Sequence, residues 1–304
     1  MTEQEKALTE LISYRDRLEE IEYEDIKTLI RESIRFIPIT IAKLHKGESI
    51  DRVRLNGKTD FFKSQVEISY IKDQYVIDNY LTKFGRANKP HEPLFYGALR
   101  SSQIQQNRLT AYLETSEMIH DKESVHLEGE LFTVTRWEVQ KELIIAEIVF
   151  SDDALKNNPD TRHSFNNQFK QLNESEHREM ALRQLQLFSN EYSRKTTSHH
   201  DYKISVAYSD LLLNEYGVDA ITFPSVKSGY QGQNIVFKPE AVDKHLVLKI
   251  ASTHRMHKNK MESLMSNYHH TTEFGKDNSD FVWDLTKIDE KQLIEDSIKR
   301  ITEK

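Results

Sequence analysis

The chain has 304 residues, enough for one large domain or two. Its 42 Lys and Arg against 49 Asp and Glu give a formal net charge of -7, which argues against a general nucleic-acid binder but allows a local anion pocket. It has no cysteine, so disulfides, cysteine nucleophiles and thiolate metal sites are excluded. A charged N-terminus and the lack of a run of about 18 apolar residues predict a cytoplasmic protein with no signal peptide and no membrane span.

Residues 1–46 are predicted to form an N-terminal helical region. Apolar residues recur at helical spacing over residues 8–21 and again over residues 26–34, before Pro38 interrupts the pattern. Helices with one apolar face bury it against the rest of the protein or against a partner chain. We expect packing on the protein itself, with a docking surface as the alternative.

The remainder, residues 47–304, is predicted to be one further domain with a polar helical insertion at 151–200. A Ser at 101 or 102 is expected to cap a helix, a second helix is expected to stop at Gly217, and a charged helix to start near Glu290. Strands are expected at residues 51–55, 94–99, 130–139, 142–150, 219–223, 234–238 and 245–250. This mixed order of strands and helices predicts an α+β fold.

A few polar residues stand out against this background. They are Arg52 and Arg54 on a strand, Arg86 on a stiff loop with two prolines, Tyr96 in an apolar strand, Glu114 near the apolar side of a helix, Ser205 early in its helix, and Ser225 after a strand. Each residue taken alone is more often structural than functional. Their order and spacing carry the argument instead.

The segments "DRVR", "GRANKP", "LFYGAL", "AYLET", "YKIS" and "GVDAITFPSV" together resemble the RES family over roughly residues 49–250. The matching positions are Arg52 (with Arg54 as the alternative), Gly85, Arg86, Asn88, Pro90, Tyr96, Glu114, Ser205 and Ser225. The chain departs from the family pattern at Ala87, where many members carry Trp, and at Ala220, where many carry Gly. Both departures affect packing more than chemistry.

The resemblance implies a fold similar to ADP-ribosyltransferase toxins, in which a split mixed β-sheet with flanking helices holds a cleft. It also implies that NAD is the substrate. No metal is expected, because the histidines lack the spacing of metal ligands and the chain has no cysteine. Family members hydrolyse or phosphorolyse NAD, or transfer ADP-ribose to a protein, and many are toxins inhibited by a separate antitoxin. A separate antitoxin or immunity protein and a protein acceptor are therefore expected as partners beside NAD, with a homo-oligomer left open.

The resemblance also implies roles for the matched residues. Glu114 would stabilise the positive charge that develops on the ribose as the bond to nicotinamide breaks. Arg52 and Arg86 would bind the pyrophosphate, since a guanidinium suits it better than an ammonium. Tyr96 would stack on nicotinamide. Asn88, Ser205 and Ser225 would contact the rest of the dinucleotide.

Other kinds of site have weaker support. The histidine pairs at 199–200, 254/257 and 269–270 lack the spacing of metal ligands, and no Gly-x-Ser-x-Gly elbow indicates a serine hydrolase. The resemblance to the RES family therefore predicts an enzyme that cleaves NAD at the nicotinamide–ribose bond, as a growth-arresting toxin or a cell-suicide defence effector. A protein-modifying ADP-ribosyltransferase is the first alternative, and a catalytically idle NAD- or partner-binding module is the second.

Overall fold

A computed structural model describes residues 2–34, 37–57, 61–172, 178–275, 280–284 and 289–303. The α-helices within these residues are α1 Glu3–Ser13, α2 Tyr23–Thr28, α3 Gln65–Ile68, α4 Gln74–Tyr80, α5 Asn107–Thr115, α6 Asp152–Asn157, α7 Pro159–Gln171, α8 Arg178–Ser193, α9 Lys203–Asp210, α10 Pro239–His245 and α11 Glu290–Thr302. The strands are β1 Ile41–Leu44, β2 Ser49–Leu55, β3 Phe95–Leu99, β4 Val125–Val139, β5 Leu143–Glu147, β6 Ala220–Pro224, β7 Gln233–Phe237, β8 Leu246–Asn259 and β9 Glu262–Thr271. Short 3₁₀ or π turns, η1 Tyr14–Arg17, η2 Leu29–Ile34, η3 His199–Tyr202 and η4 Leu211–Glu215, continue or precede some helices.

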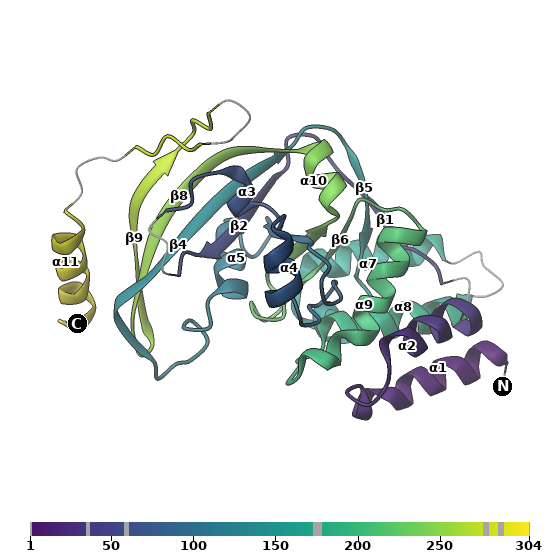
Figure 1. Cartoon of the computed structure of the whole chain (residues 1–304). Coiled ribbons are helices and arrows are strands. Elements are labelled where there is room, and N and C mark those ends of the chain that lie inside the picture. The colour runs from purple at the N-terminus through teal and green to yellow at the C-terminus, as the bar shows by residue number, and fades with distance from the viewer. Residues whose placement is uncertain are drawn as a thin grey trace.

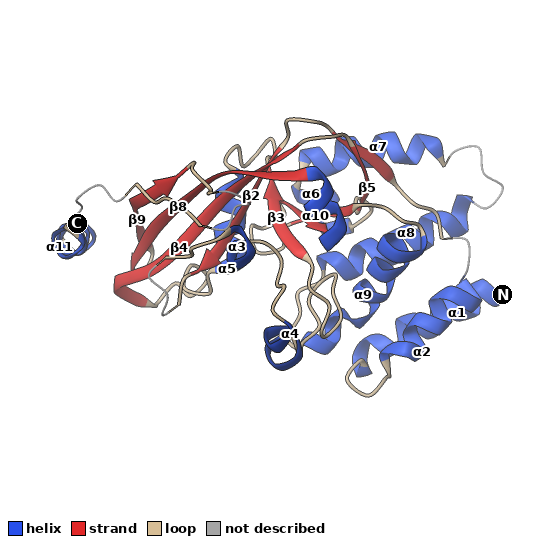
Figure 2. Cartoon of the chain, turned by 45° about the horizontal axis from the view of Figure 1, so that its top comes forward, coloured by secondary structure: helices blue, strands red, loops and turns tan. Residues whose placement is uncertain are grey.

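The strands form one mixed sheet in the order β1-β5-β6-β7-β3-β2-β4-β8-β9. All neighbours run antiparallel except β5 and β6, which are parallel. Most helices gather around one end of the sheet, while β4, β8 and β9 extend away from it as long curved strands with α11 at their far end (Figures 1 and 2). The predicted α+β class is confirmed.

The sheet is nearly divided between β2 and β3. These two strands share one register pair, Asp51 with Ala98, whereas β2 pairs with β4 from Ser49 to Leu55 and β3 pairs with β7 along its whole length. We call β2, β4, β8 and β9 the hairpin half and β1, β5, β6, β7 and β3 the helical half. Because the strands diverge beyond their single pair, a space opens between the two halves.

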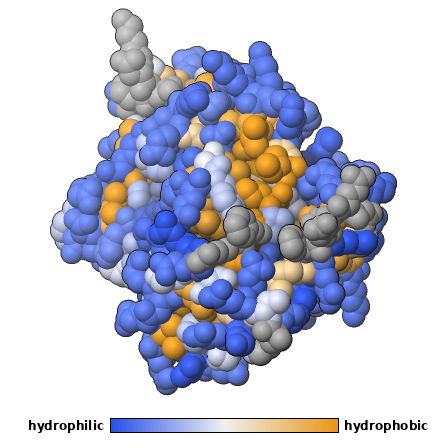
Figure 3. Space-filling view, turned by 90° about the vertical axis from the view of Figure 1, so that its right-hand side faces the viewer, coloured by the Kyte–Doolittle hydropathy of each residue, from blue (hydrophilic) through white to orange (hydrophobic). Residues whose placement is uncertain are grey.

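The N-terminal helices belong to the core of the helical half. Apolar side chains of α1 and α2, such as Leu11 and Ile26, share one buried cluster with Phe188 of α8 and Tyr208 of α9. Seen from this end the surface is mostly hydrophilic, with apolar side chains gathered near the centre of the face (Figure 3). The prediction of a helical region over residues 1–46 is wrong for Ile41–Leu44, which forms β1 on β5, because so short a segment has no periodicity that separates helix from strand.

The predicted polar insertion is helical and packs tightly. It contains α6, α7 and α8, and α8 buries Leu185, Phe188 and Tyr192 on one face. The insertion also braces the loop between β6 and β7, where Tyr230 donates a hydrogen bond to the carbonyl of Ser193. In return, Asn158 Nδ2 donates to the carbonyl of Tyr230 at 2.6 Å.

The predicted serine cap of α5 is wrong. Ser101 donates instead to the carbonyl of Gln231, and the helix begins at Asn107. Its N-terminal end is held from the sheet, because the buried carboxylate of Asp51 accepts from the backbone N–H of Arg108 at 3.1 Å. The same carboxylate accepts two bonds of 2.8 Å from the guanidinium of Arg136 on β4.

Several elements have no counterpart in the sequence prediction: α3, α4, α10 and β9. The helix after Tyr202 is confirmed as α9 with η4, and Gly217 follows it with φ +71°, which suits a residue without a side chain. The C-terminal helix is confirmed as α11. Among the described residues, no helix is both long and apolar enough to cross a bilayer.

We expect Asp51→Ala to lower the free energy of unfolding by about 3 kcal/mol, because it leaves Arg136 and the N–H of Arg108 without their partner. Urea unfolding followed by circular dichroism measures this. Glu142→Ala, which removes an exposed partner of Lys43, is the control and should leave the unfolding midpoint almost unchanged. Similar midpoints for the two variants would contradict a structural role for Asp51.

Candidate functional site

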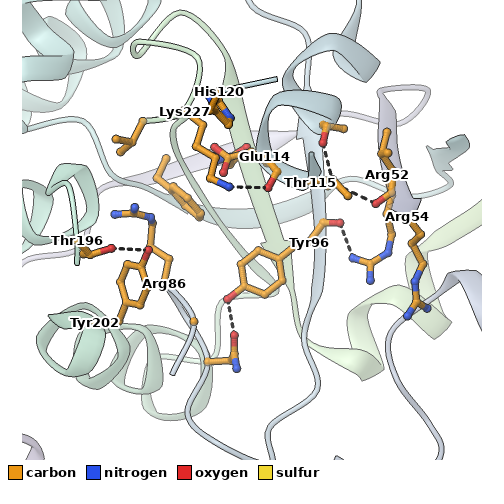
Figure 4. Close-up of a pocket in the computed structure, with 18 of the residues that line it drawn as sticks. Arg52, Arg54, Arg86, Tyr96, Glu114, Thr115, His120, Thr196, Tyr202 and Lys227 are labelled. Atoms are coloured by element: carbon orange, nitrogen blue, oxygen red, sulfur yellow. Dashed lines mark hydrogen bonds between the residues drawn. The ribbon is translucent and has the colours of Figure 1, made fainter. Parts of the chain in front are cut away.

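The space between the two halves is a cleft of about 910 Å³. Its lining comprises Arg52, Val53, Arg54 and Leu55 of β2, Tyr96 and Gly97 of β3, Ala111, Glu114 and Thr115 of α5, Gly85, Arg86 and Asn88 of the loop before β3, and His120, Lys195, Thr196, Tyr202, Phe223, Val226, Lys227 and Asn234. Six predicted site positions thus meet in one cleft: Arg52, its alternative Arg54, Arg86, Asn88, Tyr96 and Glu114 (Figure 4). Ser205 and Ser225 lie behind this lining.

Arg52 bridges the gap where β2 and β3 diverge. Its Nη1 donates to the carbonyl of Tyr96 at 2.6 Å, and its guanidinium lies 4.9 Å from the centre of the Phe95 ring. Burial, and secondarily the charge of Arg54, lowers the pKa of Arg52 to about 9, so the group is still protonated at pH 7. The buried Nε of Arg52 has no hydrogen-bond partner among the described residues.

Arg54 shares the cleft-facing side of β2 with Arg52, since side chains two positions apart point the same way. Its Nη1 donates to the carbonyl of Glu67. Both candidate arginines of this strand therefore line the cleft, with Arg52 bonded to the neighbouring strand and Arg54 to α3.

Arg86 is held at the other side of the cleft by the end of α8. Its Nη1 donates to the carbonyls of Tyr192 and Arg194, and its guanidinium lies over the Tyr202 ring at 4.9 Å. Backbone carbonyls at a helix C-terminus carry partial negative charge and favour a cation. The loop arginine is therefore fixed before any ligand arrives.

The tight loop from Gly85 to Asn88 depends on Tyr96. The Tyr96 hydroxyl donates to Asn88 Oδ1 at 2.7 Å and accepts from the N–H of Ala87 at 3.1 Å. Burial raises the pKa of the Tyr96 phenol, so it remains a donor at neutral pH. A Cβ on Gly85 would lie 2.3 Å from Asn88 Oδ1, so only glycine fits there.

Ser205 supports the loop from behind. The sequence places it at a phosphate or ribose, but its side chain is fully buried and donates to the carbonyl of Arg86 at 2.7 Å. Asn88 is likewise largely buried, and its Oδ1 stabilises the loop by accepting the hydrogen bond from the Tyr96 hydroxyl. These two residues position Arg86, and Ser205 does not line the cleft.

Glu114 presents one carboxylate oxygen to the cleft. Its Oε1 accepts from Ser225 Oγ at 2.6 Å and from Asn234 Nδ2 at 2.8 Å. Its Oε2 has no hydrogen-bond partner within the described ranges. Ser225 is fully buried, so it contacts Glu114 and not the cleft. Two donors on one oxygen fix the plane of the carboxylate and leave the other oxygen for a ligand.

The charge of the cleft is opposite to that of the protein. Its lining carries five cationic side chains, Arg52, Arg54, Arg86, Lys195 and Lys227, and one carboxylate, Glu114. Lys227 pairs with Glu117 at 2.8 Å, whereas the three arginines and Lys195 form no ion pair with a carboxylate among the residues that the structure describes. In a chain of net charge -7, this concentration of positive charge favours an anionic ligand.

Four of the lining residues that the sequence analysis missed are Asn234, Lys195, Tyr202 and Lys227. Asn234 alone carries a signal, as a polar residue at the start of an apolar strand. The others lie on irregular segments or a 3₁₀ turn whose position depends on distant contacts. No cluster of three or more potential metal ligands occurs within the described part of the chain.

Comparison with known proteins finds no family model and no curated protein that matches this chain.

We expect Tyr96→Phe to lower the free energy of unfolding by about 1–2 kcal/mol, because Asn88 Oδ1 and the N–H of Ala87 both lose their partner. Hydrogen exchange of the amides of residues 85–89 should become faster in the same variant. The matched control is Tyr75→Phe on α4, whose side chain is 65% exposed. Unchanged exchange in Tyr96→Phe would show that the hydroxyl does not hold the loop.

Proposed function

We propose that this protein is an enzyme that cleaves NAD at the nicotinamide–ribose bond and releases nicotinamide and ADP-ribose. Its role would be that of a growth-arresting toxin or defence effector, restrained by a separate antitoxin or immunity protein. The order of the motifs around Arg52, Arg86, Tyr96 and Glu114 resembles the RES family, and these four residues line one cleft.

The observation that carries the proposal is the arrangement of three arginines around one carboxylate. The arginine side chains are held by backbone carbonyls and form no ion pair with a carboxylate among the described residues. A pyrophosphate supplies the missing negative charge and accepts several N–H bonds at once. Glu114 lies among these cations with Oε2 open to the cleft.

The chemistry follows from this placement. The bond between nicotinamide N1 and ribose C1′ breaks, its electron pair leaves with nicotinamide, and the positive charge moves from the pyridinium to the sugar. Oε2 of Glu114 would stabilise that charge and accept a bond from the 2′-hydroxyl. Water then attacks C1′ and loses a proton, which completes ADP-ribose. Tyr96 offers its ring to nicotinamide, since its hydroxyl is occupied by the loop.

A protein-modifying ADP-ribosyltransferase is the second candidate. In that reaction a nucleophile of another protein takes the place of water at C1′. The apolar side chain of Leu55 lines the cleft and is 46% exposed, which would suit contact with a protein acceptor. A catalytically idle binding module is the remaining alternative, and stabilisation by NAD without turnover would favour it.

We expect Glu114→Gln to lower the rate of nicotinamide release from NAD about 100-fold or more, because the neutral amide no longer stabilises the charged ribose. Release is followed by chromatography, with and without phosphate and with a cell lysate. Glu123→Gln, an exposed change outside the cleft, should keep the wild-type rate. Full turnover by Glu114→Gln would remove Glu114 from the mechanism. Release that needs lysate, with label on a protein band, would instead indicate a transferase.

Asn234 is expected to position Glu114. Asn234→Ala removes one of the two donors on Oε1, so the carboxylate plane is less well fixed and kcat should fall about 10-fold. KM for NAD should change little, because the arginines remain in place. The combination with Ser225→Ala should be non-additive, since both act through the same oxygen. A rise in KM with unchanged kcat would contradict this role.

A further inference from the structure

The cations of the cleft form two groups on opposite sides of Tyr96. Arg52 and Arg54 lie on one side, and Arg86 lies on the other together with Thr196 and Tyr202 (Figure 4). The two groups are anchored to different parts of the protein, since Arg52 bonds to β3 and Arg86 to the end of α8. The pyrophosphate of NAD brings two negative charges, fewer than the positive charges that the two groups carry together.

The second group, which we call the Arg86 side, has unused donors. Arg86 employs only Nη1 in its bonds to the carbonyls of Tyr192 and Arg194. The hydroxyl oxygen of Tyr202 accepts from Thr196 Oγ1 at 2.8 Å, which leaves the Tyr202 hydrogen available. Lys195 lines the same cleft, is exposed, and has no ion-pair partner among the described residues.

The positive charge of the cleft exceeds the negative charge that NAD brings. Arg52, Arg54, Arg86 and Lys195 contribute four positive charges that form no ion pair among the described residues, and Glu114 contributes one negative charge to the lining. NAD brings two negative phosphates and one positive nicotinamide. A phosphomonoester adds about 1.5–2 negative charges and three acceptor oxygens at pH 7. A dinucleotide with one such group therefore matches the cleft better.

We propose that the Arg86 side binds a phosphomonoester, and that the preferred substrate is the dinucleotide phosphorylated on the 2′-hydroxyl of its adenosine ribose, NADP. This inference rests on the proposed cleavage of the nicotinamide–ribose bond, which is the same for both dinucleotides. Lys195 and Arg86 supply the charge, and Tyr202 supplies a neutral donor. Free phosphate carries the same chemical group, so the experiment has to separate the two sources.

The first test measures binding without turnover. Calorimetry of the Glu114→Gln protein compares two pairs of ligands. ADP and adenosine 2′,5′-bisphosphate share one adenosine and differ in the position of the second phosphate, and NAD and NADP differ by the 2′-phosphate. We expect NADP to bind at least about 10-fold more tightly than NAD. Lys195→Ala should remove most of that difference in affinity. Lys122→Ala, an exposed lysine outside the cleft, is the matched control and should keep it. Equal affinities, or a preference that survives Lys195→Ala, would overturn the proposal.

The second test measures nicotinamide release by the wild-type protein from NAD and from NADP. A kcat/KM about 10-fold higher for NADP than for NAD supports the proposal if the ratio of the two values falls toward one in Lys195→Ala and is kept in Lys122→Ala. If NAD and NADP react equally and inorganic phosphate accelerates both through Lys195, the subsite takes free phosphate and the proposal is wrong. If neither dinucleotide releases nicotinamide but NADP still binds more tightly, the proposed cleavage fails and the phosphate subsite stands.

Discussion

The single register pair between β2 and β3 is the constraint on which the cleft depends. Asp51 stands at this pair, and its buried carboxylate binds both Arg136 of β4 and the N-terminal end of α5. One residue therefore joins the two halves of the sheet and sets the position of the helix that carries Glu114. A longer ladder would close the space between the halves, and the next residue, Arg52, spans the gap instead.

The helical insertion and the N-terminal region both stabilise segments that line the cleft. The helical insertion holds the loop after β6 through Asn158 and Tyr230, and that loop begins with Ser225, the partner of Glu114. The connection between η1 and α2 reaches the Arg86 side through α9, since the buried ammonium of Lys203 donates to the carbonyls of Leu18 and Ile21. Both segments are therefore structural supports of the site, whatever else they contact.

Local patterns predicted much of the fold and six of the residues that line the cleft. The strands around Arg52 and Tyr96 and the helix of Glu114 follow from alternation and helical spacing, and motif order groups these residues before their contacts are known. The roles of Ser205 and Ser225 could not be predicted in this way, because each depends on a hydrogen bond to a residue more than a hundred positions away. For the same reason β1 could not be distinguished from helix, since its pairing with β5 decides its structure.

The arginines of the cleft are electrostatically unfavourable without a ligand, and an anionic ligand reduces that cost. Burial lowers the pKa of Arg52, which means that its charged form is disfavoured where it lies. The carbonyls that hold Arg52, Arg54 and Arg86 fix direction but supply only partial negative charge. An anion that enters the cleft offsets this repulsion without rearranging the side chains. On the proposed function, the ordering cost of binding is met during folding, and binding of the phosphates would restore the stability lost by burying the arginines.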